Sequence, residues 1–322
     1  MRSSMPEGFF PLDLKDILED TAPGFDLYIR HEKTEKLVLY RSRDLQFTPD
    51  VAATLRRNHH RVLYVPNDQM EKYELYLEQH LAAIAQNESL PVERRSLIVY
   101  NTSSRIMESV FNEPRASEAI RRSHAVIAPT VSLILQGEAA TRNLIALTSH
   151  DYYTYTHSVN VCIFSVALAE KIFQGEGRKK LERLGSGFLL HDIGKREIPA
   201  EIINKDGPLS QEEWKIMRRH PYLGHQILDK TGNLTEEAAI IAYQHHERYD
   251  GSGYPKRLKG EEIHIYAKIC CIADTFDALT TKRSYRRPNS SFEALQIMQN
   301  EMLGNFDRNF FNSFVGLFGP GS

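Results

Sequence analysis

Hydrophobic and polar residues follow two different patterns along the chain. Over residues 25–66, short apolar runs alternate with turns, which predicts strands at 25–30, 37–40 and 61–65. Thr48 followed by Pro49 is typical of a helix start, so a helix is expected between the second and third strands. Residues 68–84 have the pattern of a further helix. The first part of the chain is therefore predicted to be a small α/β module.

From residue 88 onward, apolar residues recur at intervals of three and four with few strand signals, so the rest of the chain is expected to be almost wholly helical. Ser210 and Glu213 have the spacing of a capping box and predict a helix that carries Met217 and His220. The expected fold class is thus mainly α. The predicted parts are the N-terminal module at 1–87, a helical connector at 88–140 and a helical domain at 141–322.

Composition and charge narrow the classes of partner and compartment. A formal net charge of -2, from 40 Lys and Arg against 42 Asp and Glu, gives no long-range attraction to nucleic acid polymers or anionic membranes. Cys162, Cys270 and Cys271 lie in apolar runs without the C-x-x-C spacing of a zinc or redox site, so buried thiols in a reducing compartment are expected. With no secretory leader and no bilayer-length apolar run in the sequence, we expect a cytoplasmic protein.

The candidate chemistry lies in histidines that occur with acidic residues in or beside apolar runs. Of 13 histidines, five have this setting: His157, His191, His220, His245 and His246. A single buried imidazole is more often a core residue satisfied by hydrogen bonds. Asp192 and Asp274 also follow apolar runs, however, and an unpaired buried carboxylate is costly. A mixed imidazole and carboxylate set suits iron, manganese or zinc, and a binuclear site bridged by Asp192 would account for all seven residues together.

Helical spacing supports this grouping. His245 lies on the same face as Ile241 and Ala242, which directs it inward. Asp192 and Lys195 are three residues apart, so the Lys195 ammonium can lie beside the carboxylate and beside an anionic ligand of the metals. A solvent-facing lysine is the alternative interpretation of Lys195.

Three motifs carry a family resemblance: His-Asp-Ile-Gly-Lys at 191–195, His-His-Glu-Arg at 245–248 with Asp-Gly-Ser-Gly-Tyr-Pro at 250–255, and Asp-Thr-Phe-Asp-Ala-Leu at 274–279. In order and spacing they resemble the HD-GYP family of the HD phosphohydrolase superfamily over roughly residues 144–316. The resemblance implies that 141–322 is an all-helical HD-type catalytic domain. It also implies a phosphodiesterase that hydrolyses cyclic di-GMP to linear pGpG, and in some members on to GMP, in bacterial second-messenger signalling.

The resemblance also assigns roles to residues. The positions that match metal ligands are His157, His191, Asp192, His220, His245, His246 and Asp274. The signature loop is matched by Gly253, Tyr254 and Pro255, and the positions expected to contact substrate phosphate are matched by Lys195, Arg283 and Arg286. Asp192 and Lys195 are the expected catalytic residues. Two arginines three apart can fork onto phosphate oxygens, with a solvated basic patch as the alternative.

One position departs from the family pattern. Some members carry a glutamate four residues before the first metal-binding histidine and hold three metals, whereas Tyr153 stands there in this chain. Because a phenol is a poor substitute for a carboxylate, we expect two divalent transition metal ions. Iron or manganese is favoured over zinc, since the set contains no thiolate. Asp277 is expected to orient the ligands, and Asp151 and Glu247 are weaker candidates for the same role.

Two other functions stay open at this point. One is an HD phosphohydrolase acting on another nucleotide, against which the intact 253–255 loop argues. The other is a non-catalytic adaptor that binds cyclic di-GMP or a diguanylate cyclase, which missing ligands would indicate, and none of the seven is missing. The N-terminal module has no cofactor motif. Its expected roles are sensing, dimerisation with a second copy, or docking of a signalling protein.

Overall fold

The computed structural model describes residues 6–31, 34–113, 116–148, 154–174, 177–231, 236–282 and 287–319. The chain divides into two compact units, residues 1–98 and 99–322. The predicted fold class, mainly helical with a small α/β module at the N-terminus, is confirmed. The three-part division at residues 87 and 140 stays a prediction. No helix in the described part of the chain has the length and apolar character needed to cross a membrane.

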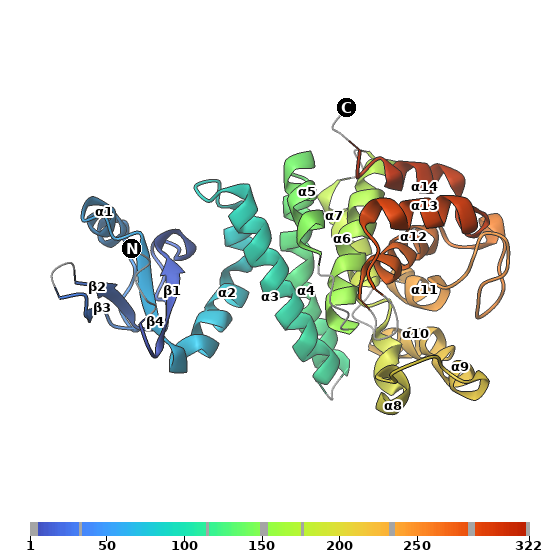
Figure 1. The fold of residues 1–322 in the computed structure, drawn as a ribbon, viewed down its shortest axis with the longest axis horizontal. Helices are drawn as coiled ribbons and strands as arrows, with labels where there is room; N and C mark the ends of the chain where they lie inside the picture. The colour runs from blue at the N-terminus through green and yellow to red at the C-terminus, as the bar shows by residue number, and fades with distance from the viewer. Residues whose placement is uncertain are drawn as a thin grey trace. The chain divides into compact units, whose positions relative to one another are not determined.

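The first unit is a small antiparallel sheet with helices (Figure 1). The sheet order is β1-β4-β2-β3, with β1 at Phe9–Asp13, β2 at Leu27–Arg30, β3 at Leu37–Arg41 and β4 at Val62–Pro66. Helix α1 spans Pro49–Arg57 and helix α2 spans Met70–Gln86. The sequence prediction missed β1. Pro11 breaks the strand pattern there, and the structure places β1 at the sheet edge, where proline is tolerated.

Helices make up almost all of the second unit. Their bounds are α3 Val92–Asn112, which begins in the first unit, α4 Ala116–Ile134, α5 Glu138–Leu147, α6 Thr154–Ile172, α7 Arg178–Leu189, α8 Ala200–Ile203, α9 Gln211–Met217, α10 His220–Thr231, α11 Glu236–Gln244, α12 Ile265–Thr280, α13 Ser291–Glu301 and α14 Arg308–Val315. A short 3-10 segment, η3, follows α7 at Ile193–Glu197.

The core of this unit is formed around α6 and α12, which pack against each other (Figure 1). Every side chain of α6 from 156 to 169 is buried, which is why its sequence is apolar nearly all round. Phe164 on α6 packs edge-on against Phe276 on α12 with ring centres 5.1 Å apart, and both contact Phe314 on α14. The predicted thiols are free and buried here, and burial raises the pKa of Cys162 to about 12.

The predicted capping box is confirmed, but the helix is shorter than expected. Ser210 Oγ accepts a hydrogen bond from the Glu213 backbone N–H at 3.2 Å, and Glu213 accepts one from the Ser210 N–H at 2.6 Å. Helix α9 then ends at Met217, and His220 begins α10 instead of continuing α9. The expectation that one helix carries both residues was wrong. Pro221 explains the break, because a proline has no N–H to donate to the carbonyl four residues earlier, here that of Met217, and it fits the first turn of a new helix.

The aromatic core predicts the first test. Replacing the fully buried Phe314 by alanine should lower the free energy of unfolding by about 3–5 kcal/mol, because removal of the ring leaves a cavity beside Phe164 and Phe276. The neighbouring Val315→Ala change removes a side chain that is 39% exposed and should cost less than about 1 kcal/mol. Urea unfolding followed by circular dichroism measures both. Equal losses in the two variants would show that this cluster does not hold the unit together.

Candidate metal centre

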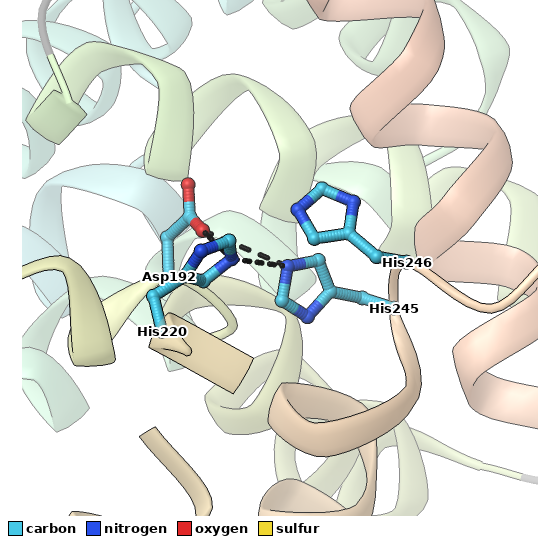
Figure 2. Close-up of side chains that lie close together, drawn as sticks. All are labelled: Asp192, His220, His245 and His246. Atoms are coloured by element: carbon cyan, nitrogen blue, oxygen red, sulfur yellow. Dashed lines mark hydrogen bonds and ion pairs between the residues drawn. The ribbon is translucent and has the colours of Figure 1, made fainter. Parts of the chain in front are cut away.

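The structure brings together all seven residues predicted as metal ligands. His157 lies on α6, His191 and Asp192 lie in the turn between α7 and η3, and Asp274 lies on α12. His220 is the first residue of α10, while His245 and His246 directly follow α11. Figure 2 shows the Asp192 carboxylate and the rings of His220, His245 and His246 converging on one another. Five of the seven, His157, His191, Asp192, His220 and His245, are at most 1% exposed.

Hydrogen bonds at the Nδ1 atoms fix the protonation of four rings. His191 donates its Nδ1–H to the Phe188 carbonyl oxygen at 2.8 Å, since a carbonyl oxygen can only accept. His220 does the same to Met217 at 2.8 Å, and His245 to Ala242 at 2.9 Å. His157 donates its Nδ1–H to the Asp277 carboxylate at 2.7 Å. In their neutral form all four rings therefore carry an unprotonated Nε2.

These four Nε2 atoms face each other in pairs. The Nε2 atoms of His157 and His191 are 3.3 Å apart, and those of His220 and His245 are also 3.3 Å apart. Neither member of a pair has a proton to donate at that atom, so two lone pairs point into the same small space. A cation between them turns this repulsion into coordination, and neutral imidazole is a common metal ligand through Nε2. The donor chemistry therefore fits metal ions.

Asp192 is shared by both pairs. Its carboxylate lies with His157 and His191 in one group of ligand atoms and with His220, His245 and His246 in another. Its Oδ1 is buried, lies 3.2 Å from His220 Nε2, and accepts no hydrogen bond from the described residues. Burial alone would raise the pKa of Asp192, but the Lys195 ammonium and the contacts with His191 and His157 hold this pKa well below its usual value. Asp192 is thus an ionised carboxylate shared by two groups of candidate ligand atoms.

Asp274 and His246 complete the open side of the cluster. Asp274 Oδ1 is 3.2 Å from His157 Nε2, and its Oδ2 is 3.5 Å from His246 Nδ1. Their side chains are 15% and 24% exposed, whereas the other five ligands are sealed from solvent. Burial would raise the pKa of Asp274, but the contact with His157 and the other nearby imidazoles lower this pKa below its usual value. The cluster is therefore open to solvent on the side of these two residues.

Gly194 allows the turn after Asp192 to approach α10. A Cβ atom at this position would lie 2.0 Å from the His220 carbonyl oxygen and 2.4 Å from the Gly224 nitrogen, so no other residue fits without moving backbone. The close packing places His220 beside Asp192. Lys195, one residue further on, brings its Nζ to 2.5 Å from Asp192 Oδ2, as the three-residue spacing predicted.

The Gly253–Pro255 loop folds back onto His246. A Cβ atom on Gly253 would lie 2.4–2.6 Å from the backbone of residues 246–248, so this glycine is needed for the close approach. The Tyr254 ring then packs on the His246 ring with centres 4.7 Å apart and planes 30° apart. Glu247 accepts hydrogen bonds from the backbone N–H groups of Lys256 and Leu258 at 2.6 and 3.0 Å. Its carboxylate therefore holds the loop.

Comparison with known proteins decides the family. Residues 140–310, just over half of the chain, match the family model described as HD domain. The chain belongs to the HD domain family. The family predicted from the sequence is thereby confirmed, and the match spans every element that carries one of the seven candidate ligands.

Several relatives of this HD domain have named activities. A cyclic di-GMP phosphodiesterase of Pseudomonas aeruginosa, PA4108, is 33% identical over 69% of this chain and 53% of its own length. The 3'3'-cGAMP-specific phosphodiesterase 2 of Vibrio cholerae is 40% identical over 44% of this chain and 27% of its own. A cyclic di-GMP phosphodiesterase of Thermotoga maritima is 39% identical over 45% of this chain and 39% of its own. The chain thus spans about half of the first relative and less of the others.

One solved structure supports the fold of nearly the whole chain. Bd1817 of Bdellovibrio bacteriovorus, described as an HDG"Y"P protein, superposes with a TM-score of 0.66. The match covers 96% of this chain and 99% of the other at 22% sequence identity. At 22% sequence identity, this likeness shows a shared fold and nothing about activity.

Some residues of the HD domain site lie outside the prediction or outside the described structure. Asp277 was expected to orient the ligands, and it does contact His157, but two further members of the same network were missed. Asn160 donates to Asp277 at 2.7 Å and accepts a hydrogen bond from the Tyr100 hydroxyl at 2.9 Å. Asn160 could have been found, because it is a polar residue one turn after His157 in an apolar helix. The predicted Arg283, Arg286, Tyr153 and Asp151 lie outside the described residues.

The hydrogen bonds of Asp277 predict a loss of metal on a nearly isosteric change. Asp277 accepts from both His157 and Asn160, and an asparagine can offer only one acceptor oxygen. We expect Asp277→Asn to weaken metal binding by about 10- to 100-fold. Competition with a chelating dye measures this, and the exposed Asp229→Asn change on α10 is the control. Unchanged affinity in Asp277→Asn would mean that His157 is oriented in another way.

Proposed function

We propose that this HD domain is a metal-dependent phosphodiesterase that hydrolyses cyclic di-GMP. The observation that carries the proposal is the Asp192 carboxylate shared by two groups of imidazole Nε2 atoms. A buried cluster of imidazoles around one shared carboxylate suits two metal ions better than it suits a structural core. The names of the relatives from Pseudomonas aeruginosa and Thermotoga maritima support cyclic di-GMP as the substrate.

The residues divide between two ion positions. Asp192 with His157 and His191 would hold one ion, and Asp192 with His220 and His245 would hold the other. Asp274 and His246, at the more exposed edge, would complete the coordination. When bound, ions of this kind lower the pKa of water and neutralise phosphate charge. The absence of thiolates from this ligand set favours iron or manganese over zinc.

Lys195 is the proposed substrate-facing cation. Its Nζ contacts Asp192 Oδ2, while 14% of the side chain remains exposed. An ammonium at the edge of the cluster can donate to a non-bridging phosphate oxygen and offset the charge that grows there during hydrolysis. Gly253, Tyr254 and Pro255 would line the same entrance, because their loop packs on His246. Arg283 and Arg286 are proposed as further phosphate contacts on the sequence alone.

The rest of the chain is assigned a regulatory role in this proposal. Residues 1–87 would sense a signal, dimerise or dock a signalling protein such as a diguanylate cyclase. We further propose a cytoplasmic location, which three buried free thiols support. The proposed product is pGpG.

Two substitutions separate metal binding from phosphate binding. Asp192→Ala should lose metal and abolish turnover, because no other carboxylate of the described cluster belongs to both groups of ligand atoms. Lys195→Ala should keep its metal and slow hydrolysis about 100-fold, because only charge stabilisation is lost. Metal content and turnover of cyclic di-GMP are measured in parallel, with the exposed Lys215→Ala as the control. Equal metal loss in the Asp192 and Lys195 variants would contradict this division of roles.

The metal count and the product form a separate prediction. Anaerobically purified protein should contain two ions per chain, iron or manganese, and a chelator should abolish turnover reversibly. Elemental analysis gives the count, and chromatography of the reaction should show pGpG accumulating without rapid formation of GMP. Three ions per chain would refute the argument from Tyr153. Rapid release of GMP would refute pGpG as the final product but would not contradict the phosphodiesterase activity.

A further inference from the structure

A row of aromatic and cationic side chains leads from the metal centre to the surface. The Tyr254 ring lies against the His246 ring, with centres 4.7 Å apart. The Arg218 guanidinium lies over the Tyr254 ring, 5.6 Å from its centre, and over the Trp214 ring, 5.8 Å from its centre. Trp214 lies on α9 and Arg218 follows one turn later, so helical spacing brings these two together. The loop of residues 253–255 supplies the third member from a distant part of the chain.

The row is open to a ligand. Trp214 is the single tryptophan of the sequence and is 44% exposed, although a ring of that size is usually covered. The acidic residues of α9 are engaged elsewhere, since Glu212 pairs with Lys215 and Glu213 pairs with Lys205. Across the described residues, Arg218 forms no ion pair with a carboxylate. Its donors are therefore available to an acceptor from outside.

The position of the row suits one part of a nucleotide. In a nucleotide the base lies one sugar away from the phosphate, and Tyr254 packs directly on a proposed metal ligand. Exposed aromatic rings bind bases by stacking. An arginine fork pairs with the O6 and N7 acceptors of guanine, whereas adenine presents an amino donor in place of O6. A phosphate held at the metal centre would thus place its base at this row.

Resting on the proposed function, we propose that Trp214, Arg218 and Tyr254 form a guanine-binding platform that selects one base of the cyclic dinucleotide. The base stacks on the exposed Trp214 ring, Arg218 donates to its O6 and N7 edge, and Tyr254 joins the platform to the metal centre. The platform determines specificity and takes no part in bond breaking. It bears on this family in particular, because the relatives include enzymes named for cyclic di-GMP and for 3'3'-cGAMP.

Kinetics on two substrates test the Arg218 contact. Arg218→Lys keeps the charge but loses the fork, so kcat/KM for cyclic di-GMP should fall about tenfold while that for cyclic di-AMP changes less than about twofold. Trp214→Ala should lower kcat/KM for both substrates. Trp214→Phe should retain most of the original kcat/KM, because stacking requires an aromatic ring but not specifically an indole. Arg219→Ala is the matched control: Arg219 is an exposed neighbour that makes no ring contact with the described residues, so this change should leave both values unchanged. An equal fall for both substrates in Arg218→Lys would overturn the guanine assignment.

Binding of single nucleotides separates this inference from the proposed function. Because Trp214 is the single tryptophan, its emission, excited at its red edge and corrected with free N-acetyltryptophanamide, reports on the platform alone. GMP titrated into the metal-loaded protein should quench this emission more strongly than AMP, and Arg218→Lys should abolish the difference. If the protein shows this quenching but hydrolyses no cyclic dinucleotide, the guanine-binding platform is supported and the proposed phosphodiesterase activity is refuted. If Arg218→Lys and Trp214→Ala both hydrolyse cyclic di-GMP as fast as the unchanged protein, the phosphodiesterase activity is supported and the guanine-binding platform is refuted.

Discussion

The metal centre depends on backbone carbonyl groups at the ends of three helices. His191, His220 and His245 each donate Nδ1–H to the carbonyl three residues earlier, near the ends of α7, α9 and α11. Carbonyls in a last helical turn have no partner within their helix, so they are free to accept. The same local bond thus fixes three rings in one tautomer and directs three Nε2 atoms to a common point. The negative ends of these helix dipoles also favour a cation there.

The rest of the domain keeps this convergence in place. Gly194 lets the turn after Asp192 touch the start of α10. Helix α6 contributes His157, which is held by a hydrogen bond to Asp277 of α12. Asp277 is itself held by Asn160, which Tyr100 of α3 contacts. A buried chain of hydrogen bonds therefore runs from Tyr100, on a helix that precedes the family match, to the candidate ligand His157.

The sequence prediction named seven residues that the structure brings together, because their chemistry is unusual for a core. Five imidazoles and two carboxylates beside apolar runs need a common explanation, and the motif order supplied one. It reached Asp277 through helical spacing. It did not reach Tyr100, because a tyrosine in an amphipathic helix carries no sign of which distant polar group its hydroxyl meets. It also misplaced His220, since the capping box marks where α9 starts, whereas Pro221 decides where it ends. Local signals predicted elements well, and contacts between distant elements required the structure.

The signature loop connects the two halves of the site through packing. Gly253 has no side chain, so the loop can lie directly on the backbone of residues 246–248, and Glu247 holds it there by two backbone N–H groups. The Tyr254 ring is thereby pressed onto the ring of His246. Because the two rings are in contact, a ligand that displaces Tyr254 must also disturb His246, which is one of the proposed metal ligands. The motif therefore joins the candidate metal centre to the aromatic row of Tyr254, Arg218 and Trp214 through direct contacts. The intact motif and the intact ligand set thus belong to one physical unit.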